Sequence, residues 1–190
     1  MSKAIVAPNQ EQLYNLAQKF EERAFQSKDP EESQKMFEKM LELYERAADL
    51  GHIPSRHNLA VRLHLNGDIS SAIYHYKIAA NAGYDCSQCN LGTIYVTDGS
   101  NHTEGLRYLE LAAEQNNRTA TKNLISYYKG ELVDGISDPA KVEEYTKKLA
   151  ILPGDDASID FDVVLPRSTP RSATATETAG RTEEKFNSRP

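Results

Sequence analysis

The stretch HYKIAANAGYDCSQCNLGTIY, residues 75–95, decides the fold because both of its halves recur along the chain at a fixed spacing. The first half, residues 75–80, recurs 32 residues earlier at 43–48 and 33 residues later at 108–113, each time ending in Ala-Ala. Each copy is followed, three residues after its last alanine, by a residue that tolerates the left-handed backbone conformation found at the C-terminal end of helices. These residues are Gly51, Gly83 and Asn116.

The second half carries an Asn-Leu pair followed, four residues after the leucine, by a large apolar side chain. The pair occurs at residues 15–16, 58–59, 90–91 and 123–124, and the apolar residues are Phe20, Leu63, Tyr95 and Tyr128. A spacing of four places both side chains on one face of a helix. Each unit is therefore an antiparallel helix pair, and because one pair cannot bury its own apolar face, we expect about four pairs to stack into an all-α solenoid.

The first unit is longer than the others, because its asparagine and the next lie 43 positions apart. We place the excess in an extended loop between its two helices, around residues 26–34. Asp29-Pro30 then starts the second helix, with a capping residue before a proline at the first helical position. Asp138-Pro139 is expected to start the last helix in the same way.

The residues Gly83, Ser87, Leu91, Gly92 and Tyr95 resemble the Sel-one-like repeats, which are relatives of the tetratricopeptide repeats. The resemblance covers about residues 11–152, and its weaker copies depart from the pattern at Ala60, Leu63, Asn116 and Ile125. It implies a right-handed solenoid that acts as an adaptor, holding a protein partner or peptide in a helical groove without chemistry of its own.

Outside residues 11–152 we expect a flexible N-terminus at 1–10 and a disordered tail containing Ser, Thr and Pro at 153–190. After Pro166 the tail has too few apolar side chains to offset the entropy of ordering it. The tail is either a passive solubilising segment or a phosphorylated one. An alternative for one part of it is an extended strip packed on the last repeat, formed by Ile159, Phe161, Val163 and Leu165.

The composition narrows the classes of partner. With 22 basic against 28 acidic residues and a net charge of −6, the chain is unsuited to tracking nucleic-acid phosphates. No stretch approaches the ~18 apolar residues of a membrane span, and the N-terminus lacks the apolar core of a signal peptide. We therefore expect a cytoplasmic, monomeric protein with no nucleic acid partner and no membrane insertion.

No catalytic motif is present, so we expect neither an enzyme nor a bound cofactor or metal. The five histidines are scattered over different predicted helices and turns. Cys86 and Cys89 lack the further ligands of a zinc site and the strand context of a redox pair. Two alternatives to the adaptor remain open: a thiol-based redox or metal-responsive protein using these cysteines, and a stoichiometric regulator of a partner enzyme.

The predicted binding groove is the face of each first helix opposite its buried stripe of Ser55, Leu59, Ala60 and Leu63. It carries a ladder of four asparagines, whose amides can pair with the backbone of an extended peptide. An alternative to peptide contact is that asparagine suits this helical position for local reasons. The convex side of the solenoid is an alternative binding site to the groove. Lys122 is the only basic residue on the face, which disfavours clamping of a terminal carboxylate. The candidate residues are Tyr14, Asn15, His57, Asn58, Val61, Cys89, Asn90, Thr93, Lys122, Asn123 and Ser126.

Overall fold

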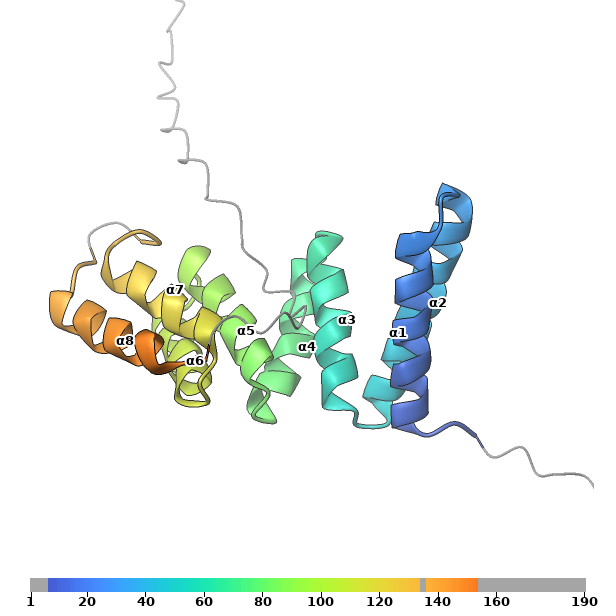
Figure 1. Ribbon diagram of the computed structural model, residues 1–190, viewed down its shortest axis with the longest axis horizontal. Helices are drawn as coiled ribbons and strands as arrows, with labels where there is room; N and C mark the ends of the chain where they lie inside the picture. Colours follow the sequence, from blue (N-terminus) through green and yellow to red (C-terminus); the bar gives the residue numbers. More distant parts are fainter. Residues whose placement is uncertain (1–6, 134–135, 154–190) are drawn as a thin grey trace, which may run out of the picture.

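The computed structural model describes residues 7–133 and 136–153, and within these ranges the chain forms helices and turns but no strand (Figure 1). The helices are α1 (Gln10–Gln26), α2 (Pro30–Asp49), α3 (Ile53–Leu65), α4 (Ile69–Asn81), α5 (Asp85–Thr97), α6 (His102–Glu114), α7 (Arg118–Tyr128) and α8 (Pro139–Ile151). Each odd-numbered helix packs against the next even-numbered one, which confirms the predicted all-α array of four pairs. The predictions for residues 1–6 and for the tail after Pro153 lie outside the described residues.

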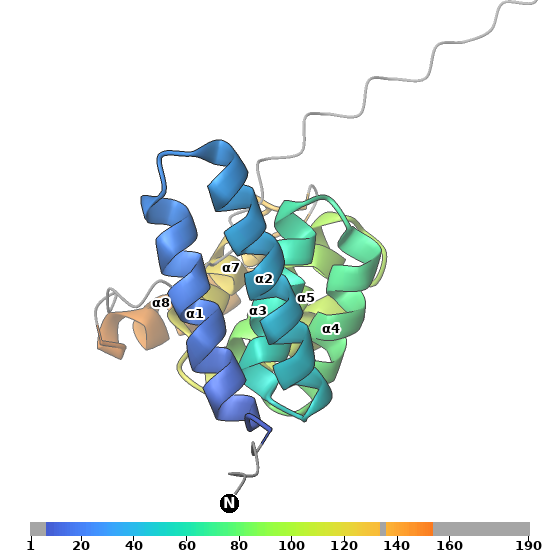
Figure 2. The same cartoon turned by 90° about the vertical axis from the view of Figure 1, so that its right-hand side faces the viewer.

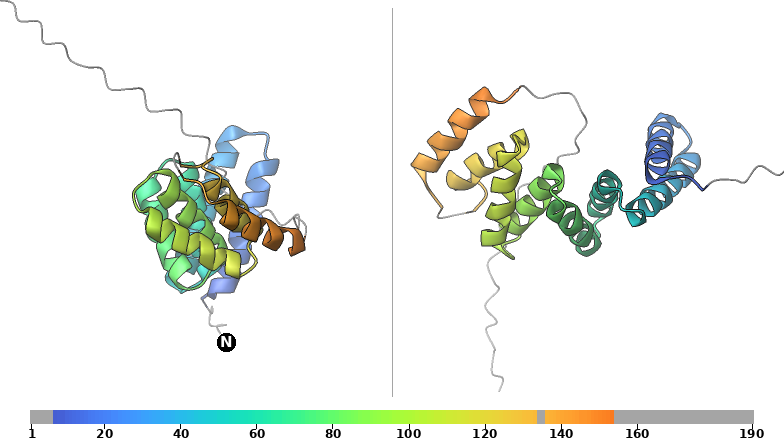
Figure 3. Two further views of the ribbon diagram at one scale, coloured as in Figure 1. Left: turned by 90° about the vertical axis from the view of Figure 1, so that its left-hand side faces the viewer. Right: turned by 90° about the horizontal axis from the view of Figure 1, so that it is seen from below.

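The four pairs follow one another along the long axis of the molecule, from α1 and α2 to α7 and α8 (Figure 1). Figure 2 looks along this axis with α1 and α2 side by side in front. Seen from below in Figure 3, the array bends so that α1 and α8 lie toward the same side. We call the surface formed by α1, α3, α5 and α7 the inner face.

The predicted helix ends are confirmed. The Asp29 carboxylate accepts a hydrogen bond from the backbone N–H of Glu31 at 2.9 Å, and Asp138 caps α8 in the same manner. The turn after α4 has Gly83 at φ +89°, and the equivalent turn after α6 has Asn116 at φ +69°. Asparagine is the side chain that best tolerates this left-handed conformation, so the turn is kept where glycine is absent.

The extended loop predicted in the first unit is wrong. Only residues 27–29 connect α1 and α2, and the excess lengthens both helices to 17 and 20 residues, against 13 in each helix of the next two pairs. The additional turns pack on each other: the rings of Phe25 and Phe37 meet edge to face at 5.3 Å, and the Ser33 hydroxyl donates to the Ala24 carbonyl at 2.8 Å. Longer helices therefore replace the loop, because their additional residues have apolar partners.

Small residues set the spacing within the pairs. A Cβ atom added to Gly92 on α5 would lie 2.8 Å from the carbonyl oxygen of Gly105 on α6. The preceding pair has the fully buried Ala60 and Ala72 at the equivalent positions. The described residues form three clusters of buried side chains between the helices, in which Tyr44, Tyr76 and Leu91 have no exposed surface.

Candidate functional site

The structure buries much of the face that the sequence predicted to be open. At the centre of the array His57, Val61, Cys89, Asn90 and Thr93 are each at most 8% exposed. At the ends the candidate residues are more accessible. Asn15 and Lys122 are exposed, and Tyr14, Asn58, Asn123 and Ser126 are half-buried.

The burial arises because successive first helices contact each other as well as their own partners. His57 on α3 and Ser87 on α5 share a hydrogen bond of 2.8 Å, and the Asn123 amide on α7 donates to the Thr93 hydroxyl on α5 at 2.8 Å. The central helix α5 therefore has ten buried residues among its 13. Of the predicted groove residues, those on α5 are therefore buried, and the accessible ones lie on α1, α3 and α7.

The asparagine ladder makes hydrogen bonds inside the solenoid. The Asn90 amide donates to the Tyr76 hydroxyl of the preceding helix at 3.3 Å, and Asn58 bonds to the equivalent Tyr44. Asn15 donates only to the exposed Glu11 carboxylate, at 3.4 Å. In the second and third units, asparagine therefore satisfies a tyrosine hydroxyl that the core buries, a structural reason for the repeated residue.

This arrangement predicts different effects of removing individual asparagines. Asn90→Ala leaves the buried Tyr76 hydroxyl without this partner and should lower the free energy of unfolding by about 1–3 kcal/mol. Asn15→Ala changes only an exposed contact and should stay within roughly 0.5 kcal/mol of the wild type. Urea unfolding followed by circular dichroism measures both, and equal effects of the two substitutions would contradict the structural role of Asn90.

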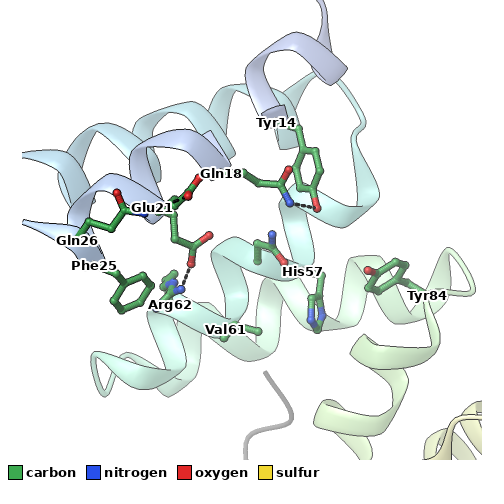
Figure 4. Close-up of a pocket in the computed structure, with 11 residues that line it drawn as sticks. Tyr14, Gln18, Glu21, Phe25, Gln26, His57, Val61, Arg62 and Tyr84 are labelled. Carbon is green, nitrogen blue, oxygen red and sulfur yellow. Dashed lines mark hydrogen bonds and ion pairs between the residues drawn. The ribbon is translucent and has the colours of Figure 1, made fainter. Parts of the chain in front are cut away.

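An accessible pocket of about 460 Å³ lies between α1 and α3 (Figure 4). It includes the candidates Tyr14, His57, Asn58 and Val61. Gln18 also lines it, at the position of the first unit equivalent to Val61. The sequence-based candidates did not include the other lining residues, which are Glu21, Glu22, Phe25, Gln26, Arg62 and Tyr84. Phe25 and Gln26 stand in the last turn of the lengthened α1, where the sequence predicted a loop to begin.

A half-buried ion pair fixes one side of the pocket. Glu21 on α1 and Arg62 on α3 form a salt bridge, with side chains 18% and 14% exposed. Glu21 also accepts a hydrogen bond from the Tyr44 hydroxyl of α2 at 2.9 Å, so one carboxylate joins three helices. The Arg62 guanidinium lies 5.7 Å from the centre of the Phe25 ring, and burial lowers its pKa. Because the charges of this pair are matched, the pocket wall is polar but locally neutral.

His57 forms the opposite part of the wall (Figure 4). Its ring lies between those of Tyr76 and Tyr84, at 5.8 and 5.1 Å between centres. Burial lowers the pKa of His57 to about 4, although the carboxylate of Asp85 acts in the opposite direction. The imidazole is therefore neutral near pH 7, and this side of the pocket presents aromatic surface without charge.

The two cysteines occupy the middle of the array rather than the pocket. Cys86 and Cys89 are 8% and 1% exposed and form no disulfide bond. Within residues 7–133 and 136–153, no three His, Cys, Asp or Glu residues cluster in a way that could hold a metal ion. Buried thiols react slowly, since reactivity requires an accessible thiolate.

Comparison with known proteins places the chain in a family. The family model described as Sel1 repeat matches residues 13–43, 41–52, 53–84 and 87–117. The chain therefore belongs to the Sel1 repeat family, and α7 and α8 form a further pair beyond the matched residues. No functionally curated protein matches the chain.

Two solved structures show a weaker likeness. They are immunity protein Pa5087 from Pseudomonas aeruginosa (17% identity, 74% of this chain and 67% of that chain, TM-score 0.47) and immunity protein PA5088 from the same organism (19% identity, 84% and 76%, TM-score 0.49).

In the part of the chain that the structure describes, no helix combines the length and the apolar character needed to cross a membrane.

Proposed function

We propose that the protein is an adaptor that binds a partner protein, and that the pocket between α1 and α3 receives one side chain of that partner. The observation that supports this is the pocket itself, whose 460 Å³ is enough for a large side chain. The proposal assigns no catalysis. It places the chain in the cytoplasm, in keeping with two cysteines that are not joined in a disulfide bond.

The lining of the pocket favours a large apolar side chain as the occupant. Phe25 is 60% exposed, and the half-buried ring of Tyr14 offers further apolar surface. Buried aromatic or aliphatic anchors of this kind supply most of the binding energy in typical protein interfaces. The exposed Glu22 at the pocket further favours a basic residue beside the anchor.

The test is affinity capture with the full chain, comparing the wild type with Phe25→Ala and Gln18→Arg. Phe25→Ala removes an aromatic ring from the wall of the pocket. Gln18→Arg places a large, positively charged side chain in the pocket from an exposed position. A specific partner should bind at least about tenfold more weakly to each variant, as expected when an interface anchor is lost. Gln18 is exposed, so circular dichroism should show an unchanged melting temperature for Gln18→Arg. Phe25→Ala also removes the ring contact with Phe37 and should lower the melting temperature slightly, so Gln18→Arg is the variant that separates binding from stability.

The matched control is Tyr74→Ala, which removes an aromatic ring that is 62% exposed on α4, outside the inner face. It should leave binding unchanged. A partner lost with Tyr74→Ala but retained by both pocket variants would move the site to the outer helices and overturn the assignment. If the captured partner is an enzyme, assays of its activity with the chain added decide whether the protein regulates it or only bridges it to other proteins.

A further inference from the structure

The groups behind the pocket fix the orientation of the Asn58 amide. The Tyr44 hydroxyl has a single proton, which it donates to the Glu21 carboxylate at 2.9 Å. Asn58 bonds to the same hydroxyl, so its amide N–H has to donate to the phenol oxygen. The carbonyl oxygen of Asn58, a half-buried residue of the pocket lining, is therefore left as a hydrogen-bond acceptor.

The two other amides of the lining are held in the same way. The Gln18 amide donates to the Tyr14 hydroxyl at 3.0 Å (Figure 4), and the Gln26 amide donates to the Glu22 carboxylate at 3.1 Å. Among the residues that the structure describes, no donor is paired with the carbonyl oxygens of these two side chains or of Asn58. The pocket thus offers hydrogen-bond acceptors beside its aromatic walls.

Tryptophan is the side chain that matches this combination. Its indole ring supplies a large apolar surface, and its N–H is a donor that brings no acceptor with it. The rings of Phe25, Tyr14 and Tyr84 line a cavity of about 460 Å³ that can take such a ring. Phenylalanine or leucine would cover the carbonyl oxygens without pairing them, which costs free energy. Arginine would have to lose its water beside a wall in which Arg62 already matches the Glu21 carboxylate.

We propose that the pocket between α1 and α3 selects a tryptophan of the partner protein, whose indole N–H donates to the carbonyl oxygen of Asn58. The inference rests on the proposed function, because it names the side chain that the pocket receives. It also gives Glu21 a role in recognition: by holding the Tyr44 proton, Glu21 keeps the Asn58 amide turned so that its oxygen is available to the ligand.

The test uses a short peptide, acetyl-Gly-Lys-Trp-Gly-amide, whose lysine suits the exposed Glu22 at the pocket. The chain itself contains no tryptophan, so fluorescence excited where tyrosine does not absorb reports on the peptide alone. Titration with the full chain should shift the emission of the peptide to shorter wavelength. The matched competitor carries benzothienylalanine, which has the shape of tryptophan with sulfur in place of the N–H. It should bind at least about fivefold more weakly, because it leaves the Asn58 oxygen without a donor.

Asn58→Leu locates the acceptor that makes this distinction. Leucine has a similar volume but no acceptor, so the two peptides should bind this variant with equal affinity. The lost bond to Tyr44 should lower the melting temperature, but the ratio of two affinities for the same folded protein does not depend on its stability. Tyr74→Ala is the control and should keep the preference for tryptophan. An undiminished preference in Asn58→Leu would overturn the assignment of Asn58.

The comparison of the two peptides on the wild type tests the inference even if Asn58→Leu fails to fold. Equal affinities would overturn the preference for tryptophan and leave the pocket as a site for any large apolar side chain. No emission shift up to the solubility limit of the peptide would also overturn it. In both cases affinity capture with Gln18→Arg still tests the proposed function separately.

Discussion

Gly92→Val is expected to unfold the central part of the solenoid. An added Cβ at this position would lie 2.8 Å from the carbonyl oxygen of Gly105, 2.9 Å from Cγ of Leu109 and 3.0 Å from its backbone nitrogen. Two of these atoms belong to the backbone of α6 and cannot move without moving the helix. Overpacking of this kind should lower the free energy of unfolding by roughly 3 kcal/mol or more.

The effect should spread beyond one helix pair because of the linear architecture. In a repeat array, stability is approximately a sum of units and of the interfaces between neighbouring units. Helix α5 also packs against α4 and α7, so displacing it weakens both neighbouring pairs. We expect a large loss of helical circular dichroism at 222 nm for the variant, rather than local fraying at one end.

Urea unfolding of Gly92→Val, with Gly83→Ala as the control, separates close packing from backbone strain. Gly83 has φ +89° but no atom within 4 Å of an added Cβ, so its replacement should cost only about 1 kcal/mol. If Gly92→Val were no less stable than Gly83→Ala, α5 and α6 would not approach as closely at Gly92 as the structure shows.

The sequence was sufficient to predict the helix pairs because the signals for helix ends are local. Asp29 and Asp138 begin helices, and Gly83 and Asn116 close them, each through contacts within a few residues. The length of α1 was predicted wrongly because it depends on a contact between two helices, which local signals do not reveal. Only the packing of Phe25 on Phe37, across the turn, shows that α1 continues to Gln26.

The inner face was predicted only in part, since its burial depends on how each pair is rotated against the next. The helical spacing correctly placed Tyr14, Asn58 and Val61 on one side, where they line the pocket. It could not show that α3 and α5 approach closely enough for His57 to bond to Ser87. Nor could it pair Glu21 with Arg62, because the two residues are 41 positions apart in different repeats.

Acidification is expected to destabilise the protein through His57. Burial lowers the pKa of this imidazole to about 4, whereas an unfolded histidine has a pKa near 6.5. Between these values the unfolded chain binds a proton that the folded chain does not, so the free energy of unfolding falls as the pH falls. Above pH ~6.5 the group contributes nothing to this dependence, and below pH ~4 the loss is complete. At pH 5 these two pKa values give a loss of about 2 kcal/mol.

The measurement is the free energy of unfolding in urea at pH 7 and pH 5, for the wild type and for His57→Gln. Glutamine can still bond to the Ser87 hydroxyl but does not titrate, so the wild type should lose about 2 kcal/mol more than the variant over this range.

His75→Gln is the matched control. Burial and Arg56 lower the pKa of His75, but Glu45 and Asp49 oppose them, and the ring is only half-buried. Its removal should therefore change the pH dependence less. Identical pH dependence in the wild type and His57→Gln would show that His57 accepts a proton without disturbing the contact between α3 and α5.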